Sequence, residues 1–240
     1  MARDLLLAID SSTELLCVAA CAGDRVAAWS GPGGSQASQS MFERIRLVLG
    51  DLGLEPGDLQ AIGFGRGPGA FTGLRAACAV AQGLAFGLER PVVPVDSLLI
   101  VAEAARMLAP DGPAASDLGV LMDARMNEVY AARFGWDGSV WDVLQPPGLW
   151  TPAALAAAWS AADAPQAWVG TGLGLLPPDP SRPVVAARDE DRAQALLRLV
   201  RQRWQSGGAV PAAQALPIYV RDKVASTTAE RASAALGNAA

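Results

Sequence analysis

The chain has 240 residues, of which 51% are hydrophobic and 18% are charged, so it can bury a core and is not disordered overall. It contains no histidine, and its single lysine is Lys223. These two features exclude Ser-His-Asp and Cys-His catalysis, histidine-ligated metal sites and any GK[ST] phosphate loop before that lysine. The net charge of −5 makes the chain a poor candidate for gripping nucleic acid alone, because neutralised phosphates supply most of that affinity.

The cysteines and the start of the chain predict a soluble cytoplasmic protein. Cys17, Cys21 and Cys78 are odd in number, lack CxxC spacing and lie in apolar runs, which favours buried free thiols in a reducing compartment. Only five apolar residues lie between Asp4 and Asp10, too few for a signal-peptide core. The longest uncharged apolar stretch, Ala76 to Leu88, is too short to cross a bilayer, so we expect no membrane segment.

The first half of the chain predicts a three-stranded meander followed by alternating helices and strands. Strands are expected at Leu5–Ile9, Leu15–Cys21, Val26–Trp29, Ala61–Gly65 and Pro91–Val95, and helices at Met41–Leu52, Phe71–Leu88 and Ser97–Leu108. The first of these helices is indicated by apolar residues that recur at spacings of one and three. A stretch rich in Pro, Gly and Ala, Ala109–Ser116, predicts a boundary.

The second half repeats this element order. Strands are expected at Leu118–Met122, Glu128–Phe134, Val140–Leu144 and Ala167–Gly170, and helices at Pro152–Ala162 and about Asp191–Trp204. Strands that alternate with helices indicate mixed α/β sheets covered by helices. A duplicated unit whose first strand ends in aspartate is typical of the ribonuclease-H-like lobes of the actin, Hsp70 and sugar-kinase (ASKHA) superfamily. We therefore predict two such lobes in tandem, residues 1–109 and 110–240.

The glycine-rich segment from Gly65 to Arg75 leads from a predicted strand into a predicted helix. Phosphate cradles are built this way, because the N–H groups of the first helical turn point at the anion. The spacing, however, is neither GxGxxG nor a Walker A motif. A tight turn that lets the helix pack closely on the strand therefore stays open as the alternative.

Two strand ends, at Asp10 and at Asp123, are expected to face a common cleft. In nucleotide-using members of the superfamily such corners hold phosphates and Mg²⁺, but their turns need glycine, and neither corner has one. We therefore predict a vestigial nucleotide or phosphate site, with no metal or cofactor of its own. Its candidate residues are Asp10, Ser12, Arg66, Gly67, Gly69, Thr72, Arg75 and Asp123.

The predicted helix Phe71–Leu88 is apolar on every side, since Gln82 is the only polar residue between Ala76 and Gly87. Such a helix must be covered all round, either within its own fold or by a second subunit. We favour a subunit interface shared with the preceding helix, because a domain this small rarely has enough layers to enclose it. The expected interface residues are Phe42, Ile45, Leu49, Ala76, Ala79, Val80, Gly83, Leu84 and Gly87, of which Ala79, Gly83 and Gly87 form a smooth stripe at four-residue spacing.

Four segments together resemble the bacterial TsaB (YeaZ) family, which is often grouped with M22 glycoproteases. They are Ala8–Thr13, Gly65–Arg75, Asp123–Arg125 with Glu128–Tyr130, and the tail segment Pro217–Ala225. The resemblance implies two ribonuclease-H-like lobes and a role in making threonylcarbamoyladenosine in tRNAs that read codons beginning with A. It also implies a noncatalytic subunit that binds and stabilises TsaD, which carries the metal and the transfer chemistry. The ATPase TsaE joins the pair, and tRNA is met only through the complex.

In this family the first two helices bind TsaD, and in isolation they can form a homodimer. They map onto about Ser38–Leu52 and Phe71–Leu88 here. One departure is the absence of a histidine that many members have before the first helix, where this chain has Ser35–Gln39. The alternative hypothesis is an ATP-dependent kinase or carbamoyltransferase of the same superfamily that uses Asp10 and Asp123. A peptidase is the weakest hypothesis, because the metal-binding histidines of TsaD have no counterpart.

Overall fold

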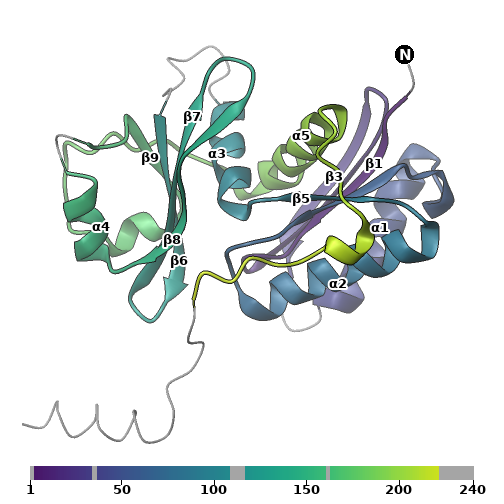
Figure 1. Ribbon diagram of the computed structural model, residues 1–240, viewed down its shortest axis with the longest axis horizontal. Coiled ribbons are helices and arrows are strands. Elements are labelled where there is room, and N and C mark those ends of the chain that lie inside the picture. The colour runs from purple at the N-terminus through teal and green to yellow at the C-terminus, as the bar shows by residue number, and fades with distance from the viewer. Residues whose placement is uncertain (1–2, 34–36, 109–116, 161–162, 222–240) are drawn as a thin grey trace, which may run out of the picture.

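The computed structural model describes residues 3–33, 37–108, 117–160 and 163–221, which form two mixed sheets with helices between and around them (Figure 1). The strands are β1 (Leu5–Asp10), β2 (Leu15–Ala22), β3 (Arg25–Pro32), β4 (Ala61–Gly65), β5 (Val92–Val95), β6 (Asp117–Arg125), β7 (Glu128–Trp136), β8 (Trp141–Trp150) and β9 (Ala167–Val169). The helices are α1 (Ala37–Leu52), α2 (Phe71–Leu88), α3 (Ser97–Leu108), α4 (Pro152–Ala158) and α5 (Arg192–Gln205).

The first sheet has the order β3-β2-β1-β4-β5, in which the meander is antiparallel and β1, β4 and β5 are parallel. Side chains alternate along each strand, so the apolar residues of a strand contribute to both faces of the sheet. Leu7 and Ile9 of β1 pack in the cluster that contains the inner sides of α1 and α2. Leu6 and Ala8 point the other way, into the cluster that contains α5. The sheet is therefore covered on both sides, as its nearly continuous apolar strands require.

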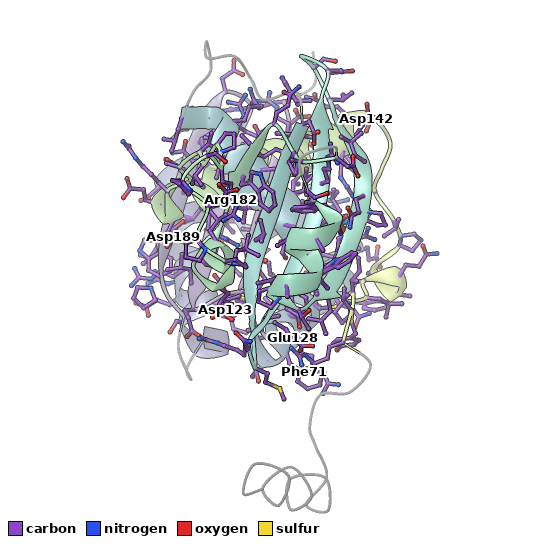
Figure 2. The ribbon with its side chains drawn as sticks, turned by 90° about the vertical axis from the view of Figure 1, so that its left-hand side faces the viewer. Phe71, Asp123, Glu128, Asp142, Arg182 and Asp189 are labelled. Atoms are coloured by element: carbon purple, nitrogen blue, oxygen red, sulfur yellow. The ribbon has the colours of Figure 1, made fainter. Side chains whose placement is uncertain are left out.

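The second sheet has the order β8-β7-β6-β9, which repeats the order of the first four strands of the first sheet. A parallel bridge between Trp168 and Val184 lies beyond β9, where the first sheet has β5. Figure 2 looks onto the outer face of this sheet, which α4 partly covers. The repeated sheet order confirms the prediction of two ribonuclease-H-like lobes.

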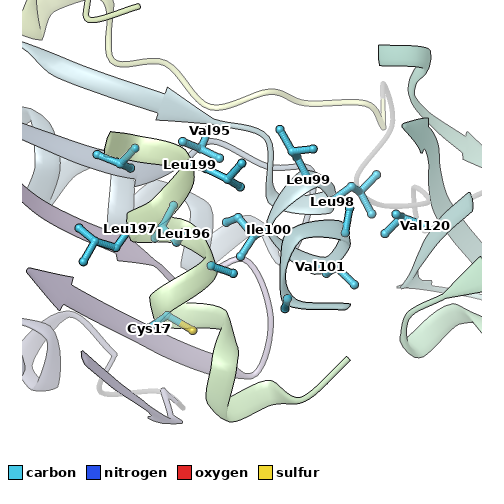
Figure 3. Close-up of a cluster of buried hydrophobic side chains, with 14 of the residues drawn as sticks. Cys17, Val95, Leu98, Leu99, Ile100, Val101, Val120, Leu196, Leu197 and Leu199 are labelled. Atoms are coloured by element: carbon cyan, nitrogen blue, oxygen red, sulfur yellow. The ribbon is translucent and has the colours of Figure 1, made fainter. Parts of the chain in front are cut away.

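The helices α3 and α5 lie between the two sheets and are exchanged with respect to the sequence (Figure 3). The helix α3 follows the first sheet in the chain but packs on β6, β7 and β9, whereas α5 follows the second sheet and packs on the first. One hydrophobic cluster, with Leu98, Val120 and Leu196 among its members, therefore runs through both lobes. The boundary segment 109–116 lies outside the described residues, so the division at residue 109 stays a prediction.

The predicted elements agree with the structure in order and type, and the ends of α2 and α3 coincide with those predicted. The largest difference is β8, which runs to Trp150 although it contains Pro146 and Pro147. Because β8 is an edge strand, these prolines need no ladder hydrogen bond, and the pairing with β7 shifts register beside them. The helix α4 ends at Ala158, and residues 161–162 of its predicted range lie outside the described chain. The three cysteines are buried and free, as predicted.

Candidate functional site

The outer sides of α1 and α2 expose apolar residues, which on α1 lie beside the charged Glu43 and Arg46, and we call these apolar residues together the helix surface. Its members are Phe42 and Leu47 on α1 and Ala79, Gly83, Phe86 and Gly87 on α2. The side chains of Phe42 and Phe86 are 54% and 59% exposed. A Cβ atom built on Gly83 or Gly87 would meet nothing within 4 Å, so this stripe of α2 is open to the approach of another backbone.

The structure corrects part of the predicted interface. Ile45, Leu49 and Val80 are buried and pack in the core between α1, α2 and the first sheet, so they are not available to a partner. Ala76 and Leu84 are half-buried at the edge of the same core. The reason is that each helix turns its most apolar side toward the sheet, and only the opposite side remains outside.

Two surface residues, Leu47 and Phe86, were missed by the sequence analysis. Phe86 follows Gly83 by three residues and therefore lies on the same side of α2, which its spacing alone could have shown. Leu47 is 39% exposed although its neighbour Val48 is buried. The periodic run Met41, Ile45, Val48 and Leu52 includes Val48 and not Leu47, so the spacing already indicated which of the two faces the sheet.

The whole of α2, by length and composition, is apolar enough to cross a membrane, with a mean hydropathy of 1.3. The sequence expectation counted only the uncharged run from Ala76, whereas the helix begins at Phe71 and includes Arg75. A third of α2 is buried inside the fold, against the first sheet. Its apolar composition therefore serves two different sides, one packed on the sheet and one exposed.

Asp10, at the end of β1, is fully buried and held on both oxygens. Its Oδ2 accepts a hydrogen bond from Ser12 Oγ at 2.8 Å, and its Oδ1 accepts one from Ser97 Oγ at 3.2 Å. Arg192, the first residue of α5, reaches Oδ2 with its Nη2 at 3.4 Å. Asp10 therefore acts as an internal anchor that joins the first sheet to α3 and α5.

The thiol of Cys17 lies opposite Asp10 in the ladder between β1 and β2. Burial is the main cause that raises the pKa of this thiol to about 11, although the positive charge of Arg192 acts in the opposite direction. The thiol therefore stays protonated at neutral pH. A protonated, buried thiol is not a nucleophile.

The glycine-rich segment packs directly against the end of β1. A Cβ atom on Gly65 would lie 1.8 Å from Asp10 Oδ1, and one on Gly73 would lie 1.8 Å from the carbonyl oxygen of Ser11. A Cβ atom on Gly69 would lie 2.2 Å from the carbonyl oxygen of Ser12. These glycines permit close packing of the chain on itself, which is the tight-turn alternative of the sequence analysis.

The two arginines of this segment have partners within the chain. Arg66 forms a 2.5 Å ion pair with Asp96. Arg75 stacks on the ring of Phe71 at 3.8 Å and donates a hydrogen bond to the hydroxyl of Tyr219 at 3.0 Å. Thr72, the remaining predicted phosphate ligand on α2, is exposed, and Gly67 packs against the side chain of Leu74.

The second corner, after β6, forms its turn without glycine. Arg125, Met126 and Asn127 have φ values of 64°, 56° and 58°, so three successive residues adopt the left-handed conformation. The carboxylate of Asp123 supports the turn by accepting a 2.6 Å hydrogen bond from the Arg125 amide. The turn forms without glycine because a local carboxylate and the β6–β7 ladder hold its left-handed backbone. The expectation that a phosphate-holding corner needs glycine concerns the approach of a ligand, and it stays a prediction.

A cleft of about 490 Å³ lies between the two corners and is lined by residues of both lobes. We call it the interlobe cleft. An ion pair of 2.6 Å between Glu14 and Arg125 joins its two walls. The segment 218–221 lines the cleft. At one end the Ile218 amide donates a hydrogen bond to the Arg66 carbonyl, and at the other end Arg221 forms an ion pair with Glu128. Asp123 and Glu128 lie close together near the bottom of Figure 2.

The structure divides the predicted nucleotide residues into two groups. Ser12, Gly69 and Asp123 line the interlobe cleft. Asp10, Arg66, Gly67, Thr72 and Arg75 do not line it. Arg192 also lines the cleft, and the sequence analysis missed it. No local pattern could have indicated this residue, because it lies 182 positions from its partner Asp10.

Two sheets with the same strand order, a helical layer between them and a cleft at the ends of their first strands define a two-lobed ribonuclease-H-like protein of the ASKHA type. Residues 35–166 match a family model described as "TsaD: tRNA N6-adenosine threonylcarbamoyltransferase". The tRNA threonylcarbamoyladenosine biosynthesis protein TsaB of Escherichia coli is 30% identical over 92% of this chain and 96% of its own length. The chain belongs to the TsaB (YeaZ) family.

Further relatives agree with this assignment. The TsaB protein of Haemophilus influenzae is 38% identical over 53% of this chain and 52% of its own length. The solved structure of YeaZ from Pseudomonas aeruginosa is 35% identical, covers 90% of this chain and 99% of its own, and has a TM-score of 0.78. The fold and the family of the chain are therefore established together.

Proposed function

We propose that the chain is a noncatalytic subunit for threonylcarbamoyladenosine modification of tRNA, and that it binds and stabilises a TsaD-type catalytic subunit in the cytoplasm. The proposal is supported by its family, whose curated members are named for biosynthesis of this nucleoside. In this proposal the TsaE ATPase joins the pair, tRNA is met only through the complex, and the isolated chain can form a homodimer. No metal or cofactor bound by this chain alone is required.

The helix surface carries the proposal. Two phenylalanines more than half exposed, together with a glycine stripe that no side chain of the described chain covers, make an unusual exterior for a monomer. Aromatic anchors beside flat, small residues suit a partner helix, because the partner backbone can approach the glycines while its side chains surround the rings. Burial of the remaining exposed area of Phe42 and Phe86 would contribute roughly 0.8–1.6 kcal/mol each, because each side chain is already nearly half buried.

The alternative kinase or carbamoyltransferase hypothesis is favoured by no observation. Such chemistry needs carboxylate oxygens that can bind Mg²⁺ beside a nucleotide. Both oxygens of Asp10 are buried and hydrogen-bonded, so a metal ion could bind there only if those bonds broke. Asp123 is accessible but uses its Oδ1 to hold its own turn.

A reconstituted reaction tests the proposed role. We expect the chain alone to incorporate no labelled threonine into tRNA and to hydrolyse no ATP. We expect its omission from a mixture that contains TsaD, TsaE, tRNA and the activated threonylcarbamoyl donor to reduce incorporation to background. Full incorporation without the chain, or incorporation by the chain alone, would contradict the proposal.

The substitution Gly83→Leu tests the helix surface. Its side chain enters open space in the free chain, so folding should be unaffected, but it would hold a partner helix away. We expect affinity for TsaD, measured by calorimetry, to fall roughly thirtyfold or more, the size of an interface hot spot. The matched control is Gly174→Leu, which is also exposed without neighbours but lies in the second lobe. Equal binding by the two variants would remove the helix surface from the proposal.

A further inference from the structure

Arg192 is a buried cation with unused hydrogen-bonding capacity. The residue is 4% exposed, and its Nε is buried with no hydrogen-bond partner in the described chain. Its Nη2 makes long contacts, at 3.4 Å to Asp10 and 3.5 Å to Ser12, and the side chain also hydrogen-bonds the Cys17 thiol. A guanidinium has five N–H donors, and a buried donor without a partner is costly, so such a group in a native fold calls for an explanation.

The position of Arg192 supplies one. It lies where the interlobe cleft of about 490 Å³ meets a second hollow of about 250 Å³, and it lines both. Thr171, Met122 and Asp189 also line both hollows, so the two spaces share part of their walls. The larger one alone has the volume of an ordinary small-molecule site.

The lining of the cleft restricts the class of ligand. Most of its surface is apolar and includes Leu15, Phe71 and Tyr130. Three carboxylates and three guanidinium groups line it: Glu14, Asp123 and Asp189, and Arg125, Arg192 and Arg221. Asp10, whose Oδ2 lies 3.4 Å from Arg192 Nη2, offsets the positive charge of that arginine. The cleft therefore has no excess of positive charge with which to hold a polyanion such as a nucleoside triphosphate.

We propose that the interlobe cleft binds a small, singly charged organic carboxylate, with its carboxylate group on Arg192 and its apolar part against Leu15 and Tyr130. A planar carboxylate matches the fork of a guanidinium, and the Arg192 guanidinium is held by Asp10 only through the long Nη2 contact of 3.4 Å. Binding requires the side chains of this chain alone. The inference is independent of the role proposed for the helix surface, which lies on the outer sides of α1 and α2.

The test uses benzoate as the probe, titrated into the full chain at low ionic strength and followed by ligand-observed NMR. We expect saturable binding that Arg192→Gln weakens at least tenfold, since a charge-assisted pair is lost. We expect Asp189→Asn to tighten binding about threefold, because it removes a negative charge from the cleft wall. Asp189 is exposed, and it contacts Arg192 through its backbone carbonyl, which accepts the Arg192 amide hydrogen bond and is retained in asparagine. This second variant therefore decides the question if Arg192→Gln fails to fold.

The matched control is Asp142→Asn, which removes the same charge from an exposed position on β8, far from Asp123 in Figure 2. It should leave benzoate binding unchanged. Parallel titrations with inorganic phosphate and with Mg-ATP should show weaker binding than benzoate. The inference is overturned if benzoate does not bind, if both cleft variants bind it like the wild type, or if Mg-ATP binds more tightly and displaces it. Loss of benzoate binding would leave the TsaD interaction untouched, so the two proposals fail separately.

Discussion

Replacement of Gly73 by alanine is expected to destabilise the fold by about 3 kcal/mol, the upper part of the range for overpacked sites. The added methyl group would lie 1.8 Å from the carbonyl oxygen of Ser11, which is backbone and cannot rotate away. Ser11 also donates a hydrogen bond from its hydroxyl to the Gly73 carbonyl at 2.8 Å, so the same shift would stretch this contact. The measurement is the free energy of unfolding from urea denaturation.

Gly83→Ala is the control in the same helix. Its methyl group meets nothing within 4 Å, and alanine is favoured over glycine in a helix interior by about 1 kcal/mol. We therefore expect this variant to be as stable as the wild type or more stable. Equal stability of the two alanine variants would show that the first turn of α2 does not pack on the end of β1 as described.

Substitution of Glu103 by leucine is the second change with a large expected effect. This α3 carboxylate is buried and accepts hydrogen bonds from Arg106 at 2.7 and 2.8 Å, from Arg198 at 3.0 Å and from the Trp141 indole at 2.9 Å. Breaking a buried pair by removing one partner costs about 3–5 kcal/mol. Arg198 is 58% exposed and can turn to water, so we expect the lower end of that range.

For a chain of this length such a loss lowers Tm by roughly 6–12 °C. The control is Glu103→Gln, which retains the shape and some acceptor capacity and should lose less than half as much. Because Glu103 joins α3 to α5 and to β8, both lobes should unfold in one transition in the wild type. A leucine variant with a Tm within the error of the wild type would refute the role of Glu103 as the link between the lobes.

The order and type of the elements could be predicted from the sequence because they depend on local patterns. The apolar runs that end at Asp10 and Asp123, the periodic helices and the glycine turns all report on contacts within a few residues along the chain. The duplication of the strand order followed from the same patterns. The resemblance to the TsaB family added the identity of the two helices that a partner would meet.

The exposed side of α1 and α2 was predicted only in part. An all-apolar helix such as α2 has no polar stripe to mark its outer side, so the sequence did not show which of Val80 and Gly83 is exposed. The sheet beneath decides between them, since Val80 packs in the core and Gly83 faces open space. On α1, which has charged residues on its outer side, Ile45 and Leu49 belong to the periodic apolar side. They were assigned to the interface and lie in the core instead.

The amino-acid sequence alone determined the two-lobed α/β plan, the free cysteines and the exclusion of histidine chemistry, because each depends on composition or on neighbours along the chain. Only the tertiary structure decided that α3 and α5 are exchanged between the sheets and that Arg192 lies behind Asp10 at the cleft. Asp10 and Arg192 are brought together by packing over 182 positions, and no local pattern encodes which distant charge a buried carboxylate will meet.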